Sequence, residues 1–518
     1  MTQIAISNLT FAYPGAPAPL FKELSLRIDT DWKLGLVGRN GRGKTTLLDL
    51  IQGKYEYQGT ITPRLQTRRF PAPSVDEERD ALALLDSRCP DRPLWVLKRE
   101  LSRLQCPEEI LSRPFKTLSH GERTKVLLAS LFLEKDVFAL IDEPTDHLDA
   151  EARAVVVDYL RSKRGFILVS HDRTLLDDCV DHILALNRSG VELQKGNFSS
   201  WFRNRELQDG MERDLNEKLE REMGRMKEAS RRTAEWSDRV ERSKRGALDK
   251  GFVGHKAAKM MKRSKNLENR REAAIETKRG LLRNVETTQA LQLRPLRYHA
   301  QTLVRVSGVS IRYGDHVACR DVGFEVGCGE RVALIGGNGT GKSSILKLIE
   351  GKDLDFCGEL HRASGLSLSC VPQDTSFLRG RLSDYARREG LDESLVRALL
   401  EKMDLVREKL DVDMSELSQG QKKKVLIAVS LSRSAHLYIW DEPLNFVDVF
   451  SRIQIEELLL TFKPALLFVE HDRAFVGRIA TKVITMQPTA PKSVEKKSVE
   501  KKSFERTSFG DSSRHEAP

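Results

Sequence analysis

The chain has 518 residues, of which 40% are hydrophobic and 31% are charged, and its formal net charge at pH 7 is +11. This length gives room for about two to four domains, each with a sizeable core. No apolar run comes near the roughly 20 residues that span a bilayer, and the first residues lack the pattern of a secretory signal. We therefore expect a cytoplasmic protein without a membrane partner. The positive charge indicates a polyanionic partner if it is concentrated in one segment.

The cysteines are scattered along the chain without a CxxC pair. Such spacing argues against a zinc site, a disulfide framework or an iron–sulfur cluster, and it predicts small buried thiols in a reducing compartment. The residues concerned are Cys89, Cys106, Cys179, Cys319, Cys328, Cys357 and Cys370.

Residues 1 to about 200 predict a first α/β unit that contains a phosphate-binding loop. Alternating apolar and polar residues predict strands at 8–13 and 24–28. A short apolar run at 34–37 leads into a glycine-rich loop, and an apolar helix start follows it. In this context the backbone N–H groups cradle phosphates, a lysine neutralises them and a hydroxyl holds Mg²⁺. The predicted phosphate ligands are Gly38, Asn40, Gly41, Gly43, Lys44, Thr45 and Thr46, with Thr45 at the metal.

Four further segments of this unit follow in order along the chain. Residues 74–117 have a helical pattern interrupted by prolines, and the sequence Leu-Ser-His-Gly-Glu at 118–122 opens a helix that continues through Ser130. Apolar runs at 137–141 and 166–169 predict buried strands. The first of them ends at Asp142-Glu143 and the second at Ser170-His171-Asp172.

Residues 201 to about 298 predict a helical linker of different character. Strand patterns end, charges of both signs are frequent, and apolar residues recur every three or four positions from Leu215 to Met226. Such a narrow apolar seam is typical of a coiled coil. Glycines at 246, 251 and 254 indicate a turn. We expect two antiparallel helices of about 40 residues, or roughly 60 Å, each.

Residues 299 to about 488 repeat the first unit in the same order, at an offset of roughly 300 residues. The second phosphate loop contributes Gly336, Asn338, Gly339, Gly341, Lys342, Ser343 and Ser344. The residues Tyr13, Lys44, Leu118, Asp142 and His171 are matched by Tyr313, Lys342, Leu417, Asp441 and His471. Residues 489–518 are polar and low in complexity, which predicts a disordered tail.

The ordered set of phosphate loop, Leu-Ser-x-Gly segment, strand ending in Asp-Glu and histidine after the next strand resembles an ABC-type ATPase, present twice. Two such domains joined by a charged helical linker resemble the ABC-F family over nearly the whole chain. The resemblance implies an α/β fold with two tandem nucleotide-binding domains, at 1–200 and 299–488, joined by an antiparallel helical hairpin at 201–298. It also implies an ATP hydrolase that uses ATP and Mg²⁺, and a monomer in which the two domains pair within one chain.

In that family the two domains face each other head to tail and enclose two nucleotides. One site would join residues 38–46 to Ser418 and Gly420, and the other would join residues 336–344 to Ser119 and Gly121. The serine hydroxyl and the glycine N–H, at a helix N-terminus, would hold the γ-phosphate from across the interface. Closure would then depend on ATP, because each domain supplies half of each site.

The resemblance also implies roles for the polar residues that follow the strands. Asp142 and Asp441 would order Mg²⁺, with Thr45, Ser343 and Gln373 also at the metal. The carboxylates that would position or deprotonate the attacking water are Glu143 and Glu442, and the residues that would sense the γ-phosphate are His171 and His471. The tyrosines that could stack on adenine are Tyr13 and Tyr313; the alternative is a half-buried strand tyrosine.

The two sites differ in sequence, and we do not expect them to be equivalent. The first domain has Phe70-Pro71-Ala72 where the metal-contacting glutamine is expected. The signature segments carry His120 and Gln419 in place of a glycine. After Asp-Glu-Pro, the second domain continues with residues 444–448, Leu-Asn-Phe-Val-Asp, where the first has Thr-Asp-His-Leu-Asp.

Most of the positive charge lies near the predicted linker tip. Between Arg239 and Lys265 there are ten basic and two acidic residues, a net charge of +8 within the +11 of the chain. A charge run is usually a solvated face, but its place on a protruding hairpin beside two ATPase domains favours RNA phosphates. The predicted contact residues are Lys250, Phe252, Val253, Lys256, Lys259, Lys262, Arg263 and Lys265.

Segments 231–237 and 251–265 of the linker, residues 32–44 and residues 441–445 resemble the Lsa/Vga-type antibiotic-resistance members of the family. The short 74–117 region leaves no room for the inserted arm of the housekeeping members. This resemblance implies ribosome protection: binding at the E site, with the linker reaching past the P-site tRNA toward the peptidyl-transferase centre of the 23S rRNA. The implied drugs are lincosamides, streptogramin A and pleuromutilins.

Two other functions stay open at this point. The protein could be an ABC-F translation factor that acts on stalled ribosomes without a drug role. It could also be the ATPase component of a transporter, although this chain has no spanning segment. The apolar tip residues Phe252 and Val253 likewise have two interpretations, either packing across the hairpin or approaching the drug-binding part of the ribosome.

Overall fold

The structure is a computed structural model. It describes residues 2–16, 18–72, 78–90, 92–134, 136–146, 148–187, 190–243, 295–403, 405 and 409–487, without the side chains of 213, 226, 227 and 229–243. The predicted linker tip, the second linker helix and the tail at 489–518 therefore lie outside the described residues. Among the helices described, none combines the length and the apolar character that a membrane span requires.

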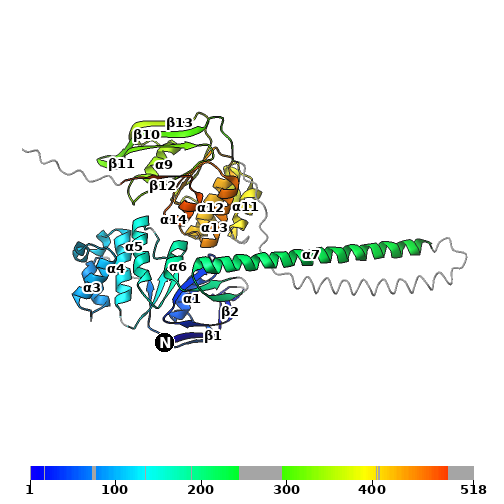
Figure 1. The fold of residues 1–518 in the computed structure, drawn as a ribbon, viewed down its shortest axis with the longest axis horizontal. Helices are drawn as coiled ribbons and strands as arrows, with labels where there is room; N and C mark the ends of the chain where they lie inside the picture. The colour runs from blue at the N-terminus through cyan, green and yellow to red at the C-terminus, as the bar shows by residue number, and fades with distance from the viewer. Residues whose placement is uncertain are drawn as a thin grey trace, which may run out of the picture.

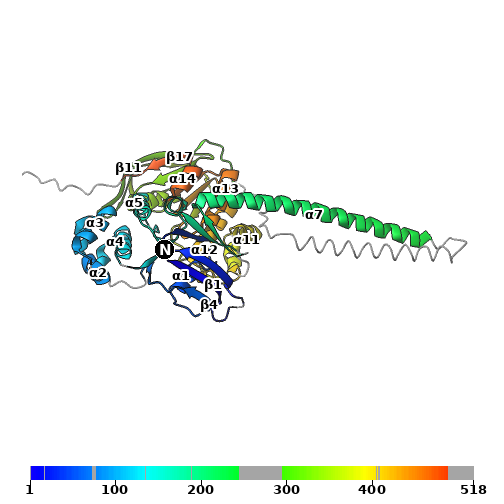
Figure 2. The same ribbon diagram turned by 60° about the horizontal axis from the view of Figure 1, so that its bottom comes forward.

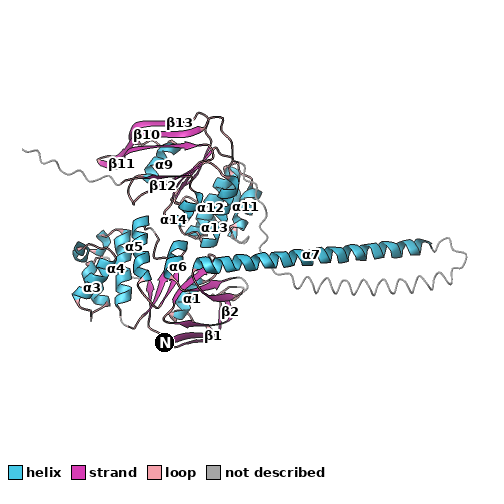
Figure 3. Cartoon of the chain, in the orientation of Figure 1, coloured by secondary structure: helices cyan, strands magenta, loops and turns pink. Residues whose placement is uncertain are grey.

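The first domain contains two sheets and the helices that cover them (Figures 1 and 3). Its six-stranded sheet has the order β5-β6-β7-β3-β8-β9, in which only β9 is antiparallel to its neighbour. A three-stranded antiparallel sheet has the order β2-β1-β4. The elements are β1 Gln3–Phe11, β2 Phe21–Asp29, β3 Lys33–Gly38, α1 Lys44–Ile51, β4 Gln58–Thr62, β5 Thr67–Phe70, α2 Ala81–Arg88, α3 Leu94–Arg103, η1 Glu108–Ser112, η2 Phe115–Thr117, α4 His120–Leu133, β6 Phe138–Asp142, α5 Ala150–Arg161, β7 Phe166–Val169, α6 Arg173–Cys179, β8 His182–Leu186 and β9 Val191–Lys195.

The second domain repeats this architecture. Its five-stranded parallel sheet has the order β14-β15-β16-β12-β17, and its antiparallel sheet has the order β11-β10-β13. The elements are β10 Thr302–Tyr313, β11 His316–Gly327, β12 Arg331–Ile335, α9 Lys342–Glu350, β13 Asp355–Arg362, β14 Leu368–Val371, α10 Leu382–Arg388, α11 Glu393–Lys402, η5 Met414–Glu416, α12 Gln419–Ser432, β15 Leu437–Asp441, α13 Val449–Phe462, β16 Leu466–Val469, α14 Arg473–Ile479 and β17 Lys482–Thr485.

The strands follow from the hydrophobic pattern that each sheet requires. Strand β7 is buried along its whole length, and so is β16. One face of each parallel sheet packs against helices, and the other packs against α1 or α9 together with the antiparallel sheet. In β1 buried and exposed residues alternate over part of the strand, as expected for a sheet with one face in the core. Strands β3, β6 and β7 are parallel neighbours, so their carboxyl ends meet at one edge of the sheet.

The long helix α7 (Phe198–Ser243) leaves the first domain and projects away from both domains (Figures 1 and 2). Phe198 and Trp201 in its first turn are buried, and they belong to the same hydrophobic cluster as Val449 and Ile453 of α13. The ring of Trp201 also lies 5.9 Å from the ring of Phe450, centroid to centroid. The root of the linker is therefore packed against both domains.

The predicted fold class is confirmed, since two α/β domains of the same architecture flank a long linker helix. That helix has 46 residues. The prediction that all cysteines are buried is wrong for Cys328 and Cys357, which are exposed. Cys357 lies in β13, most of whose residues are exposed, and periodicity alone does not distinguish such a strand from a covered one.

Candidate functional site: two ATP sites between the domains

Each phosphate loop connects a buried strand to the N-terminus of a helix. In the first loop Gly43 precedes α1 with φ 88°, and in the second Gly341 precedes α9 with φ 82°. A Cβ at Gly43 would lie 2.8 Å from the Leu20 side chain, and one at Gly341 would lie 2.7 Å from the carbonyl oxygen of Ala318. Only glycine meets both the left-handed backbone and the close approach. The loop N–H groups are therefore free to turn toward an anion at the helix N-terminus.

The two loop lysines lie over their own loops. The ammonium of Lys44 donates to the carbonyl of Gly38 at 2.7 Å, and that of Lys342 donates to the carbonyl of Gly336 at 3.0 Å. Burial lowers the pKa of both lysines, although nearby carboxylates oppose the shift. For Lys44 the largest opposing charge is Asp448, which belongs to the second domain.

The candidate catalytic carboxylates follow the strands β6 and β15. Both residues have a left-handed backbone, with φ 49° at Glu143 and 45° at Glu442. This conformation is strained for a residue other than glycine, and such strain is concentrated at functional sites. The sequence-predicted pairs of aspartate and glutamate are thus held in a defined orientation at the carboxyl edges of the sheets.

The histidine after the next strand lies beside the candidate catalytic carboxylate in both domains. In the first, the backbone N–H of His171 donates to Glu143 Oε2 at 3.1 Å, and His171 Nε2 lies 3.3 Å from Glu143 Oε1. In the second, His471 Nε2 lies 3.6 Å from Glu442 Oε1, which is too long for a hydrogen bond. The histidine and the carboxylate therefore lie closer together in the first domain than in the second.

The two carboxylates have opposite pKa shifts. Burial and the like charges of Asp146 and Asp142 raise the pKa of Glu143 well above its usual value. Burial also acts to raise the pKa of Glu442, but His471 and the amide of Gln373 outweigh it, and the net pKa is lowered. Gln373 Nε2 donates to Glu442 Oε2 at 2.9 Å.

Three residues after the candidate catalytic glutamate, the second domain has an amide where the first has another carboxylate. Asn445 Nδ2 donates to Glu442 Oε2 at 2.6 Å, at the position that Asp146 occupies after Glu143. The difference at this position stabilises an ionised carboxylate in the second domain and disfavours it in the first.

The residues predicted to hold Mg²⁺ fit this role in the second domain. One oxygen of Asp441, Oδ1, is buried and has no hydrogen-bond partner in the part of the chain that the structure describes. The Ser343 hydroxyl is hydrogen-bonded to the same carboxylate. In the first domain the Thr45 hydroxyl donates to Asp142 Oδ2 at 3.2 Å, but Arg69 of β5 also binds that oxygen.

Both signature segments begin helices with a capping box. Ser119 accepts a hydrogen bond from the N–H of Glu122, and the Glu122 carboxylate accepts one from the N–H of Ser119. Ser418 and Gln421 form the same pair at the start of α12. These caps fix the predicted serines at helix N-termini, where the dipole favours an anion.

The first phosphate loop is in contact with the signature segment of the second domain. The Asn40 side chain donates to the carbonyl of Phe446 at 3.1 Å. A Cβ at Gly420 would lie 2.9 Å from Asn40 Nδ2 and 2.2 Å from the Phe446 carbonyl oxygen, so glycine is required there. We call this arrangement of residues 38–46 with Ser418 and Gly420 the first ATP site.

The second phosphate loop faces the first domain in the corresponding way. The N–H of Asn338 donates to Asp149 Oδ2 at 3.4 Å, and Asp149 also caps α5. A Cβ at Gly121, however, would find only Leu148 and Ala152 of its own domain within 4 Å. We call residues 336–344 with Ser119 and Gly121 the second ATP site; its signature segment is less closely engaged.

The two predicted adenine-stacking tyrosines lie beside their phosphate loops. The hydroxyl of Tyr13 is hydrogen-bonded to that of Thr46 at 2.8 Å, and the hydroxyl of Tyr313 donates to that of Ser344 at 3.1 Å. Both side chains are partly exposed, at 42% and 46%. Each ring is accessible enough to stack on a base. Adenine stacking by these two tyrosines stays a prediction.

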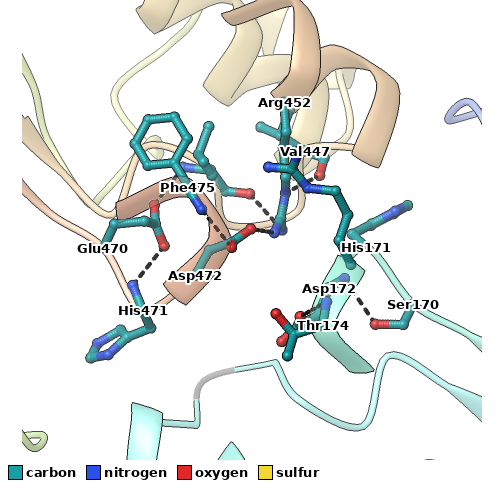
Figure 4. A network of polar contacts seen from close by, with 12 residues as sticks. Ser170, His171, Asp172, Thr174, Val447, Arg452, Glu470, His471, Asp472 and Phe475 are labelled. Atoms are coloured by element: carbon teal, nitrogen blue, oxygen red, sulfur yellow. Dashed lines mark hydrogen bonds and ion pairs between the residues drawn. The ribbon is translucent and has the colours of Figure 1, made fainter. Parts of the chain in front are cut away.

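A cross-domain network behind the histidines was not recognised in the sequence (Figure 4). Arg452 of α13 is buried, and it donates to Asp472 Oδ2 at 3.0 Å and to the carbonyls of Val447 and Leu444. The charge of Asp172, from the first domain, also acts on Arg452. The sequence repeat could have indicated this network, because Arg153 and Asp172 recur as Arg452 and Asp472 at the repeat offset.

The predicted RNA-contacting residues of the linker tip all lie outside the described residues. They therefore remain predictions from the sequence.

The comparisons with known proteins agree with this geometry. The ABC transporter family model matches residues 21–146 and 319–445, one match in each domain. The fold and the paired sites define a tandem ABC-type ATPase, an ATP hydrolase.

Three curated relatives indicate which kind of ABC-type ATPase the chain resembles. The chain is 25% identical to the energy-dependent translational throttle protein EttA of Haemophilus influenzae, over 90% of this chain and 88% of that one. It is 26% identical to the ribosome protection protein VmlR of Bacillus subtilis, over 92% and 85%. It is 27% identical to the probable ATP-binding protein YheS of Escherichia coli, over 88% and 74%. The predicted resemblance to the ABC-F family is confirmed, since these relatives are similar to the chain over most of its length.

Solved structures support the fold. An archaeal ribosome recycling factor, aABCE1, crystallised with the ribosomal stalk protein aP1, matches with a TM-score of 0.61 at 20% identity over 92% of this chain and 87% of that chain. A structure titled RNase-L Inhibitor matches with a TM-score of 0.60 at the same identity and coverage.

Proposed function

We propose that this protein is a cytoplasmic, ribosome-binding ABC-F ATPase that protects the ribosome from antibiotics acting at the peptidyl-transferase centre. The observation that carries the proposal is the pair of composite ATP sites at the root of a long projecting helix, in a chain similar to a ribosome protection protein. The proposed drug classes are lincosamides, streptogramin A and pleuromutilins, and the proposed contacts are the 23S rRNA and the P-site tRNA.

ATP binding would close the two domains, because each nucleotide would be held by the phosphate loop of one and the signature serine of the other. The N–H groups of the loop and the Lys44 or Lys342 ammonium would hold the phosphates. Mg²⁺, when bound, would neutralise charge on the β- and γ-phosphates, with Asp441, Ser343 and Gln373 around it in the second ATP site. Glu442 is the better placed general base, since an ionised carboxylate is required to accept the proton of the attacking water.

Closure would be transmitted to the linker through the packed root of α7. Phe198 and Trp201 contact α13 of the second domain, so a change in the domain angle moves the helix. The basic linker residues would bind rRNA phosphates, and Phe252 and Val253 would approach the drug-binding part of the centre.

The test is the minimum inhibitory concentration of each drug class in a sensitive host. Expression of the wild-type chain should raise it severalfold for at least one of the three classes. The matched control is the Lys44→Ala, Lys342→Ala double variant, which should be expressed normally but lose ATP binding. No increase for any of these drugs, with the protein present at normal level, would contradict drug protection.

The second candidate is an ABC-F translation factor without a drug role, and the similarity to the translational throttle protein favours it. Both candidates predict ATP-dependent co-sedimentation with ribosomes, so the drug assay distinguishes them. Co-sedimentation with membranes in place of ribosomes would favour the transporter ATPase.

The tip variants separate two mechanisms of protection. If the tip acts on the drug site, Phe252→Ala should lower resistance while ATPase activity and thermal stability stay near wild type. If Phe252 only stabilises the hairpin, thermal stability should fall along with resistance.

A further inference from the structure

The first ATP site contains an arginine that binds its metal carboxylate directly, whereas in the second the buried Lys423 ammonium lies 3.5 Å from the backbone carbonyl of Asp441. Arg69 of β5 places its guanidinium between two carboxylates, with Nη2 2.5 Å from Asp142 Oδ2 and Nη1 2.7 Å from Asp49 Oδ1. The side chains of Arg69, Asp49 and Asp142 are 16%, 11% and 14% exposed, so the bridge is largely shielded from solvent. A shielded, two-ended bridge of this kind fixes the carboxylate that it holds.

The bridge ends on the predicted metal carboxylate. Asp142 Oδ2, which binds Arg69, is also the oxygen that accepts from the Thr45 hydroxyl at 3.2 Å. The guanidinium therefore lies beside the two groups that are expected to bind Mg²⁺. A positive charge so placed repels a divalent cation and attracts the phosphates that the cation would neutralise.

The second domain lacks every part of this bridge except the aspartate. Strand register places Arg69 opposite Leu140 and Cys370 opposite Ile439, so Cys370 is the counterpart of Arg69. The counterpart of Asp49 in α9 is Lys347, a residue of opposite charge. The metal-contacting glutamine shows the reverse distribution, since the second domain has Gln373 and the first has Ala72.

We infer that Arg69 is a positioning residue that takes over part of the role of the metal in the first ATP site. It holds Asp142 in place from Asp49 and supplies positive charge next to the phosphates. The first ATP site therefore retains nucleotide when divalent cations are removed, whereas the second ATP site, which has Gln373 and no arginine, requires them. The same charge weakens Mg²⁺ binding at the first site.

The experiment measures binding of a fluorescent, non-hydrolysable ATP analogue to the full chain, in EDTA and in Mg²⁺. A Lys342→Ala background isolates the first ATP site, and a Lys44→Ala background isolates the second. The ratio of the dissociation constant in EDTA to that in Mg²⁺ should be at least about tenfold smaller for the first site than for the second, the size expected for one charge-assisted contact.

Arg69→Met in the Lys342→Ala background removes the charge but keeps most of the side-chain length. It should weaken binding in EDTA by about tenfold and weaken binding in Mg²⁺ much less, because loss of the guanidinium also strengthens Mg²⁺ binding. The matched control is Arg68→Met, one residue earlier in β5, because Arg68 is 62% exposed and pairs with Glu134 away from the site. This control should change neither constant.

A purely structural bridge gives a different result. Arg69→Met would then lower the melting temperature and weaken binding equally in EDTA and in Mg²⁺, and that outcome would overturn the inference, as would equal metal dependence of the two wild-type sites. If Arg69→Met does not fold, Asp49→Asn replaces it. This variant keeps the arginine but removes its anchor, and it should weaken binding in EDTA selectively; unchanged binding in EDTA would overturn the inference.

Discussion

Arg173 in α6 of the first domain forms a two-pronged ion pair with Glu456 in α13 of the second domain. Arg173 Nη1 lies 3.1 Å from Glu456 Oε2, and Nη2 binds Oε1. The Glu456 carboxylate is fully buried and also accepts from Arg478 Nη1 at 2.9 Å. On the opposite side of the interface, Arg473 donates to the carbonyl of Ala150 at 3.4 Å and forms no ion pair among the described residues, and the counterpart of Glu456 is Val157. The interface between the two domains thus has a buried ion pair on the side of α6 but not at the corresponding position on the other side.

This asymmetry predicts unequal effects of two matched substitutions. Arg173→Met leaves Glu456 buried with one partner fewer, and removal of one member of a buried pair costs about 3–5 kcal/mol. ATP-induced closure, measured as fluorescence energy transfer between dyes on the two domains, should require a much higher ATP concentration. Arg473→Met is the control and should leave closure nearly unchanged; equal effects would contradict the one-sided fastening.

A second prediction concerns the catalytic carboxylates. Glu143→Gln together with Glu442→Gln keeps their shape but removes the base, so phosphate release should fall by about 10²–10⁴-fold. Binding should persist, and the protein should stay on ribosomes when ATP is present. Phosphate release and ribosome co-sedimentation measure the two effects. Near-normal turnover of the double variant would exclude these carboxylates as the bases.

Glu470 provides a third prediction, because it connects the second histidine to the first ATP site. Its carboxylate accepts from the N–H groups of His471 at 2.9 Å and Leu444 at 3.2 Å, and Phe446, two residues after Leu444, accepts from Asn40. Glu470→Ser, which installs the residue that the first domain has at Ser170, should loosen residues 444–446. Nucleotide binding at the first site, isolated by Lys342→Ala, should weaken severalfold. The reciprocal Ser170→Glu variant shows whether an acid in this position is tolerated in the first domain.

A fourth prediction links stability to pH through Glu100 in α3. This carboxylate is buried and binds Lys163, Tyr159 and Arg103. Burial acts to raise the pKa of Glu100, but Lys163 and Tyr159 outweigh it, and the net pKa is lowered. Because the folded pKa lies below the unfolded value, the stabilisation is present above the unfolded pKa of about 4.3 and is lost as the pH falls through the folded pKa.

Glu100→Gln should therefore lower the free energy of unfolding at pH 7, by about 3–5 kcal/mol if the buried pair behaves as such pairs usually do. Urea denaturation between pH 7 and pH 3 should show the difference between wild type and variant shrinking toward the acid end. Glu108→Gln, at an ion pair with an exposed carboxylate, is the control and should have little effect. A difference that is constant with pH would rule out the charge of Glu100 as the cause.

A fifth prediction concerns the basic linker. Changing Lys256, Lys259, Lys262 and Lys265 to Glu should weaken ribosome binding and make it less dependent on salt, since fewer phosphate contacts release fewer counterions. Sedimentation with ribosomes over a salt series measures both. Unchanged sedimentation at moderate salt would mean that the linker charge serves another purpose.

Local sequence was sufficient for the two phosphate loops, the capped signature helices and the carboxylates at the strand ends. In each of them the chemistry resides in neighbouring residues, such as Gly43 and Lys44 before α1 or Ser119 and Glu122 at the start of α4. The order of these segments and their repetition then predicted the fold class.

The contacts between elements could not be predicted in this way. Arg69 and Asp49 are 20 residues apart, and only the placement of β5 beside α1 makes them partners. Arg173 and Glu456 are 283 residues apart, and their contact requires both domains. A basic residue after a loop, or an acidic residue on a helix, has no local sequence pattern that identifies its partner. The contacts of these residues could therefore not be predicted from the sequence.

Because the root of α7 is buried between the domains, a small rotation at the root becomes a large displacement at the far end of the helix. The helix has 46 residues, so it is roughly 69 Å long at 1.5 Å per residue. If Trp201 stays seated against Phe450 while the second domain turns, each degree of rotation displaces the far end of the helix by roughly 1.2 Å, by the geometry of a rigid rod of that length. A rotation of a few degrees between the domains would thus displace the far end of the helix by several ångströms.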